Sequence, residues 1–123
     1  MEHKAMSRGQ LSIKCKGSNG VTTMTLEGAI DASNVADFEK ALFKEAAKDT
    51  PRIHLDCSKL THLNSASFSL LVRIHKKCEQ NQGALALSGL PKKMRNIIQL
   101  LGLDKILTIH SRPKAALKSL EAL

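Results

Sequence analysis

A short polar cluster precedes a long apolar and basic segment in the stretch THLNSASFSLLVRIHKKC, which starts at Thr61. Its members are Asn64, Ser65, Ser67 and Ser69. Side chains of these types accept hydrogen bonds from the free N–H groups at a helix N-terminus, and so they cap helices. A hydroxyl at the same place is also open to phosphorylation, because a helix start favours a bound anion. The cluster therefore predicts either a helix cap or a site of covalent modification.

Nucleophilic catalysis is a weaker interpretation of Ser65. His62 is close in the sequence, and Asp31 or Asp56 could orient it in a catalytic triad. The stretch LNSAS, however, lacks the G-x-S-x-G turn that exposes a nucleophilic serine. The glycine-rich loops that bind nucleotides are also missing from the sequence. We therefore expect no enzymatic activity.

The cysteines and histidines show no metal-binding pattern. Cys15, Cys57 and Cys78 are odd in number, widely spaced and never arranged as C-x-x-C. The histidines are scattered, without the spacing of a zinc site. The sequence predicts buried free thiols, and neither a metal nor a cofactor.

Hydrophobic periodicity indicates the elements that must position the polar cluster. Alternation on both sides of residues 17–20 predicts a β-hairpin, and helical spacing from Ser65 to Gln82 predicts a helix that Gly83 ends. The remaining elements are a helix after Asn34, strands at 53–57 and 84–88, a helix opened by Pro91, an edge strand ending at His110 and a terminal helix. The resulting order, β-β-α-β-α-β-α-β-α, predicts an α/β fold with a mainly parallel sheet.

Size and composition fit one domain. The chain has 123 residues, of which 42% are hydrophobic, enough for a single core. Its longest uncharged apolar run, ALALSGL, is far shorter than the roughly 20 residues of a transmembrane helix, and its first ten residues lack a secretory signal. We expect a cytoplasmic protein with a flexible N-terminal segment at residues 1–9 and one domain at 10–123.

The net charge of +8 comes entirely from the second half. Residues 1–50 carry as many acidic as basic side chains, whereas residues 51–123 carry twelve Lys or Arg against four Asp or Glu. Such a field favours an acidic protein partner, an anionic lipid surface or nucleic acid, unless it is a solvated basic surface with no special partner. Nucleic acid is disfavoured, because the chain has three Phe and no Trp or Tyr on which bases could stack.

Local motifs recur in a recognisable order along the chain. TLEGAIDASNVADFEKAL is followed by IHLDCS, HLNSASF, GALALSG, MRNIIQLLGL and KAALKSL. From Leu11 to Leu120 this order resembles a STAS domain, the fold of bacterial anti-sigma factor antagonists. The resemblance implies a mixed sheet of about five strands with four helices packed chiefly on one side.

The resemblance also implies a function. Ser65 matches the serine that an anti-sigma factor phosphorylates, this partner being a serine kinase whose ATPase domain has a histidine-kinase-like fold. The domain would then be a bacterial phosphoprotein of transcription regulation, part of a sigma-factor regulatory complex, whose docking a phosphate abolishes. The expected partner-binding residues are Asp31, Asn64, Ser65, Ser67, Ser69, Arg73 and Lys76.

An alternative stays open. Asn64 and Ser67 stand where the family has aspartate and glycine, which alters the motif that a kinase would meet. The chain could then be a STAS subunit of a larger assembly without a phosphorylation cycle, such as a lipid-transport accessory subunit or a signalling scaffold.

Overall fold

An antiparallel sheet forms the N-terminal part of the protein. In this computed structural model, residues 2–8 and 10–123 are described, with side chains from Gln10 onward. Strands β2 (Leu11–Ser18) and β3 (Val21–Ile30) bury alternate residues and are joined by Asn19 and Gly20. Both loop residues have positive φ, 52° and 79°, as a two-residue type I′ hairpin requires.

Strand β1 (Glu2–Arg8) extends this sheet by pairing antiparallel with β2. A flexible segment is expected here from the sequence, whereas the backbone of Glu2–Arg8 continues the hydrogen-bonded ladder. The pairing is irregular between Lys4 and Met6, so the alternation that marks a strand is interrupted. The sheet therefore has six strands where about five are expected.

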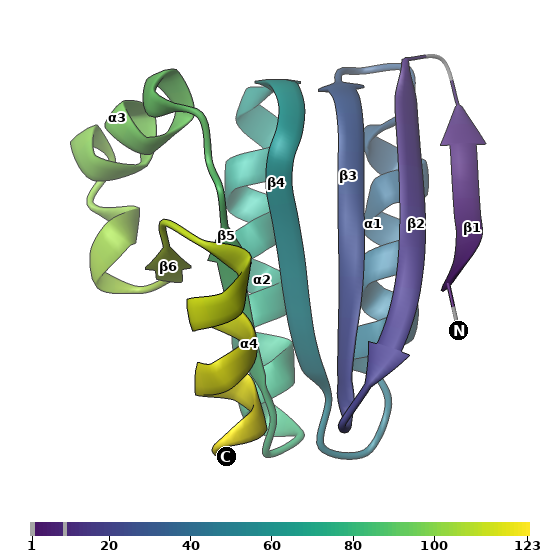
Figure 1. The fold of residues 1–123 in the computed structure, drawn as a ribbon. Coiled ribbons are helices and arrows are strands. Elements are labelled where there is room, and N and C mark those ends of the chain that lie inside the picture. Colours follow the sequence, from purple (N-terminus) through teal and green to yellow (C-terminus); the bar gives the residue numbers. More distant parts are fainter. Residues whose placement is uncertain (1, 9) are drawn as a thin grey trace.

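The other strands continue the same sheet in parallel. They are β4 (Arg52–Leu63), β5 (Ala84–Ser88) and β6 (Thr108–His110), and the spatial order follows the chain from β1 to β6 (Figure 1). Because β3 to β6 are parallel, their carboxyl ends lie at one edge of the sheet. The loops that leave this edge are the natural place for a site.

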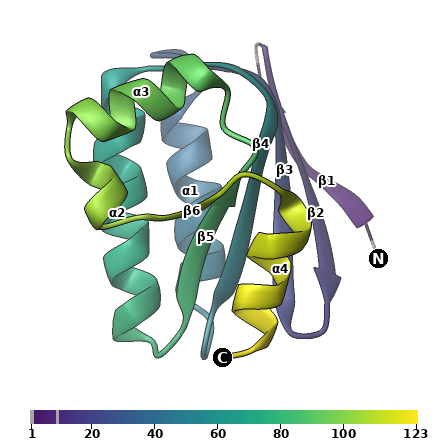
Figure 2. The ribbon, with the colours of Figure 1, turned by 60° about the vertical axis from the view of Figure 1, so that its left-hand side comes forward.

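Helices cover the two faces of the sheet unequally. Helices α1 (Val35–Ala46) and α2 (Ser65–Gln80) pack on one face over the main core, and α4 (Pro113–Glu121) lies on the opposite face over a smaller cluster (Figure 2). Helix α3 (Lys92–Leu100) and the 3₁₀ turn η1 (Leu103–Lys105) lie beyond the carboxyl edge and beside α2. The predicted mixed α/β fold with four helices is confirmed.

Strand β4 is longer than the pattern at 53–57 predicts. It runs to Leu63, and its pairing with β3 shifts register twice, between Thr25 and Glu27 and between Gly28 and Ala29. These irregularities place Leu60 and Leu63 in the core at a spacing of three, which hides the two-residue period of a strand. The extension carries the chain to the carboxyl edge just before Asn64.

The three cysteines are free and buried, as predicted. Burial raises the pKa of the Cys78 thiol to about 11, and burial together with the nearby Asp56 carboxylate raises the pKa of Cys57. Both thiols therefore behave as small apolar core residues.

Candidate functional site

The carboxyl edge of the sheet brings Asp31 and Ser65 to the same end of the molecule. Ile30 and Leu63 are the last paired residues of β3 and β4, and Asn64 N donates to Ile30 O at 3.1 Å. Each candidate therefore follows a strand end that the sheet fixes.

Asn64 is the residue that caps α2. Its Oδ1 accepts from Ser67 N at 3.1 Å and from Ser67 Oγ at 2.6 Å. Ser67 is 0% exposed, so its side chain lies beneath the helix start and cannot touch a docked partner. The expectation that Ser67 contacts a partner therefore does not fit its position, and Ser67 supports the cap instead.

Ser65 is the first residue of α2, and its side chain is exposed. Because Asn64 supplies the cap, the Ser65 hydroxyl is not needed for it. Ser69, one turn later, is exposed on the same side of α2. Both hydroxyls are thus accessible from solvent, with Ser65 nearest the positive end of the helix dipole.

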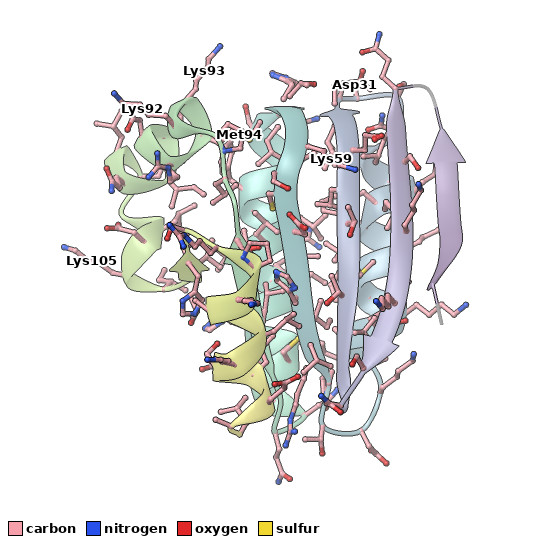
Figure 3. All side chains as sticks on the ribbon, in the orientation of Figure 1. Asp31, Lys59, Lys92, Lys93, Met94 and Lys105 are labelled. Atoms are coloured by element: carbon pink, nitrogen blue, oxygen red, sulfur yellow. The ribbon has the colours of Figure 1, made fainter. Side chains whose placement is uncertain are left out.

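Asp31 is held in a turn before α1 (Figure 3). Its Oδ1 accepts from Ser33 N at 2.9 Å and from Ser33 Oγ at 2.5 Å. These hydrogen bonds, with a smaller contribution from the positive field of His62, lower the pKa of the Asp31 carboxyl. Asn34 fixes the turn, since its Oδ1 accepts from Asp31 N at 3.0 Å and its Nδ2 donates to Ala29 O at 3.0 Å. Asp31 is therefore an ionised, oriented carboxylate at neutral pH.

The two basic candidates on α2 differ in their surroundings. Arg73 Nη2 donates to Glu39 Oε1 at 2.8 Å, and its guanidinium lies 5.9 Å from the centroid of the Phe43 ring. Arg73 thus leans toward α1. Lys76 is exposed and lies one helical turn beyond Val72, on the side of α2 that carries Ser65 and Ser69.

An apolar groove adjoins Ser65, and we call it the α2–α3 groove. It has a volume of about 870 Å³ and lies between α2 on one side and α3 with η1 on the other. Its lining residues are His62, Leu63, Asn64, Ser65, Phe68, Ser69, Val72, Ile97, Leu101 and Leu103. The hydroxyls of Ser65 and Ser69 therefore border a surface that is otherwise mostly apolar.

Sequence reasoning missed the far wall of this groove. Ile97, Leu101 and Leu103 come from a segment interpreted only as a core helix and its end. The run IIQLLGL has five large apolar residues among seven, more than one face of a short helix can bury. That excess is the signal that could have revealed the wall.

The only serine–histidine side-chain hydrogen bond among the described residues lies elsewhere. His54 Nε2 is 2.7 Å from Ser88 Oγ, and His54 Nδ1 is 3.1 Å from Thr23 Oγ1. His54 and Ser88 are 1% and 0% exposed, so no substrate reaches this pair. The contact is a satisfied polar network between the sheet and α4.

Two features are absent from the part of the chain that the structure describes. No three His, Cys, Asp or Glu side chains are grouped so that they could hold a metal ion. None of the helices is both long enough and apolar enough to cross a bilayer.

Comparison with known sequences decides the family. The STAS domain family matches residues 12–116, which is most of the chain. The protein is a member of the STAS domain family. No curated protein sequence matches it.

Solved structures of anti-sigma factor antagonists share the fold. An anti-sigma factor antagonist from Mycobacterium paratuberculosis is 23% identical with a TM-score of 0.81, and the match covers 89% of this chain and 93% of that one. For a putative antagonist from Thermotoga maritima the identity is 24%, the TM-score 0.80, and the coverage 86% and 92%. The phosphorylated form of SpoIIAA, a Bacillus cell fate determinant, is 16% identical with a TM-score of 0.67, covering 87% and 98%. This STAS domain thus has the architecture of antagonist proteins.

Proposed function

We propose that this STAS domain is a regulatory binding module similar to an anti-sigma factor antagonist, whose docking is switched by phosphorylation of Ser65. The observation that carries the proposal is the exposed Ser65 hydroxyl, which the Asn64 cap leaves free beside the α2–α3 groove. The partner would be an anti-sigma factor with serine kinase activity. The likeness in fold to SpoIIAA, which has been solved in phosphorylated and unphosphorylated forms, supports this choice.

The switch works through charge and hydration. A phosphate on Ser65 brings a charge of about −1.5 to −2 to the start of α2, where the backbone N–H groups can hold it without unfolding the helix. The same group places a hydrated dianion at one end of an apolar surface. A partner that packs flat on this surface would have to desolvate the phosphate, so docking is lost.

The proposed contact surface runs from the carboxyl edge of the sheet along α2. It comprises the exposed Ser65 and Ser69 on α2, the half-buried Asp31 at the neighbouring strand end, and the exposed Lys76 further along α2. Asn64 contributes through the cap and through its place in the groove wall. Arg73 contributes less, because its guanidinium is already paired with Glu39.

The experiment incubates the chain and ATP with each candidate anti-sigma factor kinase encoded in the same genome. We expect the intact mass to rise by one phosphate in the wild type and in Ser69→Ala, but not in Ser65→Ala. We also expect Ser65→Asp to weaken binding at least about tenfold, which corresponds to about 1.4 kcal/mol. Ser111→Asp, on an exposed residue outside the groove, is the charge-matched control. Mass gain that persists in Ser65→Ala, or Ser65→Asp that binds as tightly as the wild type, would contradict the proposal.

A second candidate is a permanently docked STAS subunit without a phosphorylation cycle. The observation favouring it is the large apolar exposure beside the groove, with Leu100 at 85% and Leu101 at 57%. A stable complex that copurifies with transporter components and is indifferent to Ser65→Asp would support this role.

A further inference from the structure

The α2–α3 groove is an open channel with two apolar walls. Phe68 and Val72 of α2 form one wall, and Ile97, Leu101 and Leu103 form the other. The α2 wall from Ser65 to Val72 is about 10 Å long at 1.5 Å per residue, or about two helical turns. The groove is therefore long enough to take about two turns of a helix.

The largest exposed apolar side chains outside the chain end belong to the segment that forms the far wall of this groove. Leu100, Leu101 and Ile106 are exposed by 85%, 57% and 43%, and all belong to the segment that contains α3 and η1. Together with the apolar walls of the groove, this exposure indicates a surface that another molecule covers. Of these residues only Leu101 lines the groove, so Leu100 serves as its natural control.

The rim of the groove is basic. Lys76 follows Val72 by one turn of α2, Lys93 precedes Ile97 by one turn of α3, and Lys105 follows Leu103 by two residues, against the single acidic residue Asp104 in the α3–η1 segment. None of these three cations belongs to an ion pair among the described side chains. Figure 3 shows Lys93 and Lys105 extending outward from α3 and η1. The rim thus attracts negative charge toward an apolar channel.

We propose that the α2–α3 groove binds an acidic amphipathic helix of the partner protein, with apolar side chains in the groove and carboxylates facing the basic rim. This inference rests on the proposed function and names the chemistry of its partner. A helix laid into an apolar groove buries one face and leaves its flanks free for charge contacts. An acidic amphipathic helix fits the length of the groove, its apolar walls and the positive charge of its rim.

The groove fits other occupants less well. A second copy of this chain would bring one basic rim against another, which is repulsive. An acyl chain would stay wet along its outer side, because Leu101 lies open on the surface instead of in an enclosed tunnel. An acidic helix satisfies both the open shape and the positive rim.

An acidic helix in the groove also explains why phosphorylation of Ser65 would weaken docking. Ser65 lines the same groove, so a phosphate there lies among the carboxylates of the docked helix. The phosphate and the carboxylates are both negative and repel each other, so the partner is released. The basic residues of the rim select the acidic helix, and the phosphate competes for the same positive field.

The probe is a synthetic, stapled amphipathic helix of about four turns with leucines at helical spacing and glutamates on both flanks. Its fluorescence anisotropy is titrated with the full-length protein. We expect it to bind at least tenfold more tightly than the same helix with lysines in place of glutamates. We expect Leu101→Ser to weaken it at least fivefold and Leu100→Ser less than twofold. Lys76→Glu combined with Lys105→Glu should weaken it at least tenfold, and Lys118→Glu on α4 less than twofold.

Unchanged melting temperatures verify that the variants stay folded, as exposed positions should. Equal binding of the acidic and basic helices, or no effect of Leu101→Ser, would overturn the inference. A dimer that sedimentation detects in the wild type and that is lost in Leu101→Ser would also overturn it, because a second copy would then occupy the groove. Binding of the protein to phosphatidylglycerol vesicles without binding of the helix would overturn it in favour of a lipid surface.

The anti-sigma factor itself separates this inference from the proposed function. If Ser65→Asp blocks its binding, while Leu101→Ser does not and the acidic helix fails to compete, the groove inference is wrong and the switch stands. If the helix competes with the factor but no kinase modifies Ser65, the groove inference stands and the switch is wrong.

Discussion

At the scale of single residues, two neighbouring side chains at the start of α2 have different roles. Asn64 accepts two hydrogen bonds from Ser67, while Ser65 contributes an exposed hydroxyl. The sequence placed the polar cluster correctly at the start of α2. It could not tell which hydroxyls face inward, because Ser65 and Ser67 differ only in their place around the helix and in what packs there. Ser67 belongs to the fold, and Ser65 is the one available for chemistry.

This division predicts the effect of removing the cap. Asn64→Ala should lower the free energy of unfolding by about 1 kcal/mol, because the Ser67 hydroxyl loses its acceptor and the Ser67 N–H keeps only the Asn64 backbone carbonyl. Urea unfolding followed by circular dichroism measures the change. Ser69→Ala, an exposed site without a cap, should change stability by less than about 0.5 kcal/mol. Equal losses in the two variants would mean that Asn64 does not cap the helix.

A second residue-level prediction concerns the charge that the family has at this position. Asn64→Asp keeps the acceptor oxygen and adds a negative charge at the positive end of the α2 dipole. We expect it to stabilise the fold by about 0.3–1 kcal/mol at low ionic strength and less in high salt. Unfolding midpoints measured at two salt concentrations test this. A stability gain independent of salt would contradict the electrostatic reason.

At the scale of elements, the site depends on how β3 and β4 end together. The two register shifts in their pairing lengthen β4 so that Leu63 meets Ile30 and Asn64 starts the helix at the edge. On its other side β3 passes close to the chain before β2, where Ala29 N donates to Gln10 O at 3.1 Å. Gly28 makes this approach possible. Its φ is 105°, and a Cβ there would lie 1.7 Å from Gln10 O.

This close approach predicts a large effect of one methyl group. Gly28→Ala should destabilise the protein by at least about 3 kcal/mol, because backbone atoms on both sides would have to move. Gly17→Ala is the matched control, since a Cβ at Gly17 meets nothing within 4 Å. It should change stability by less than about 1 kcal/mol. Thermal unfolding of both variants measures the difference, and similar melting temperatures would refute the steric argument.

At the scale of the whole molecule, the two faces of the sheet differ in chemistry. The face under α1 and α2 carries the main apolar core, whereas the face under α4 contains the buried His54 between Thr23 and Ser88. Burial lowers the pKa of His54, the Asp56 carboxylate opposes this shift, and the nearby His110 adds to it. The packing of α4 over the sheet therefore keeps His54 neutral.

The neutral His54 predicts a loss of stability in mild acid. The unfolded chain takes up a proton at His54 near the ordinary histidine pKa of 6.5, while the folded protein resists it to lower pH. The contribution of His54 is therefore complete above about pH 6.5 and declines as the pH falls from there to the folded pKa. Urea unfolding between pH 8 and pH 5 should show a smaller decline in His54→Gln than in the wild type. Identical slopes in the wild type and in His54→Gln would exclude His54 as the cause.

The sequence by itself determined the element order, the parallel half of the sheet and the place of Ser65, because hydrophobic period, turn residues and capping side chains are local signals. It also led to the STAS resemblance that the family match confirms. Only the tertiary structure decided the rest. The strand at Glu2–Arg8 exists through pairing with β2, Ser67 is buried by what lies beneath α2, and Arg73 is drawn to Glu39 on α1. The α2–α3 groove is formed by residues about thirty positions apart, so no local pattern encodes it; it arises from the way two helices meet over one edge of a sheet.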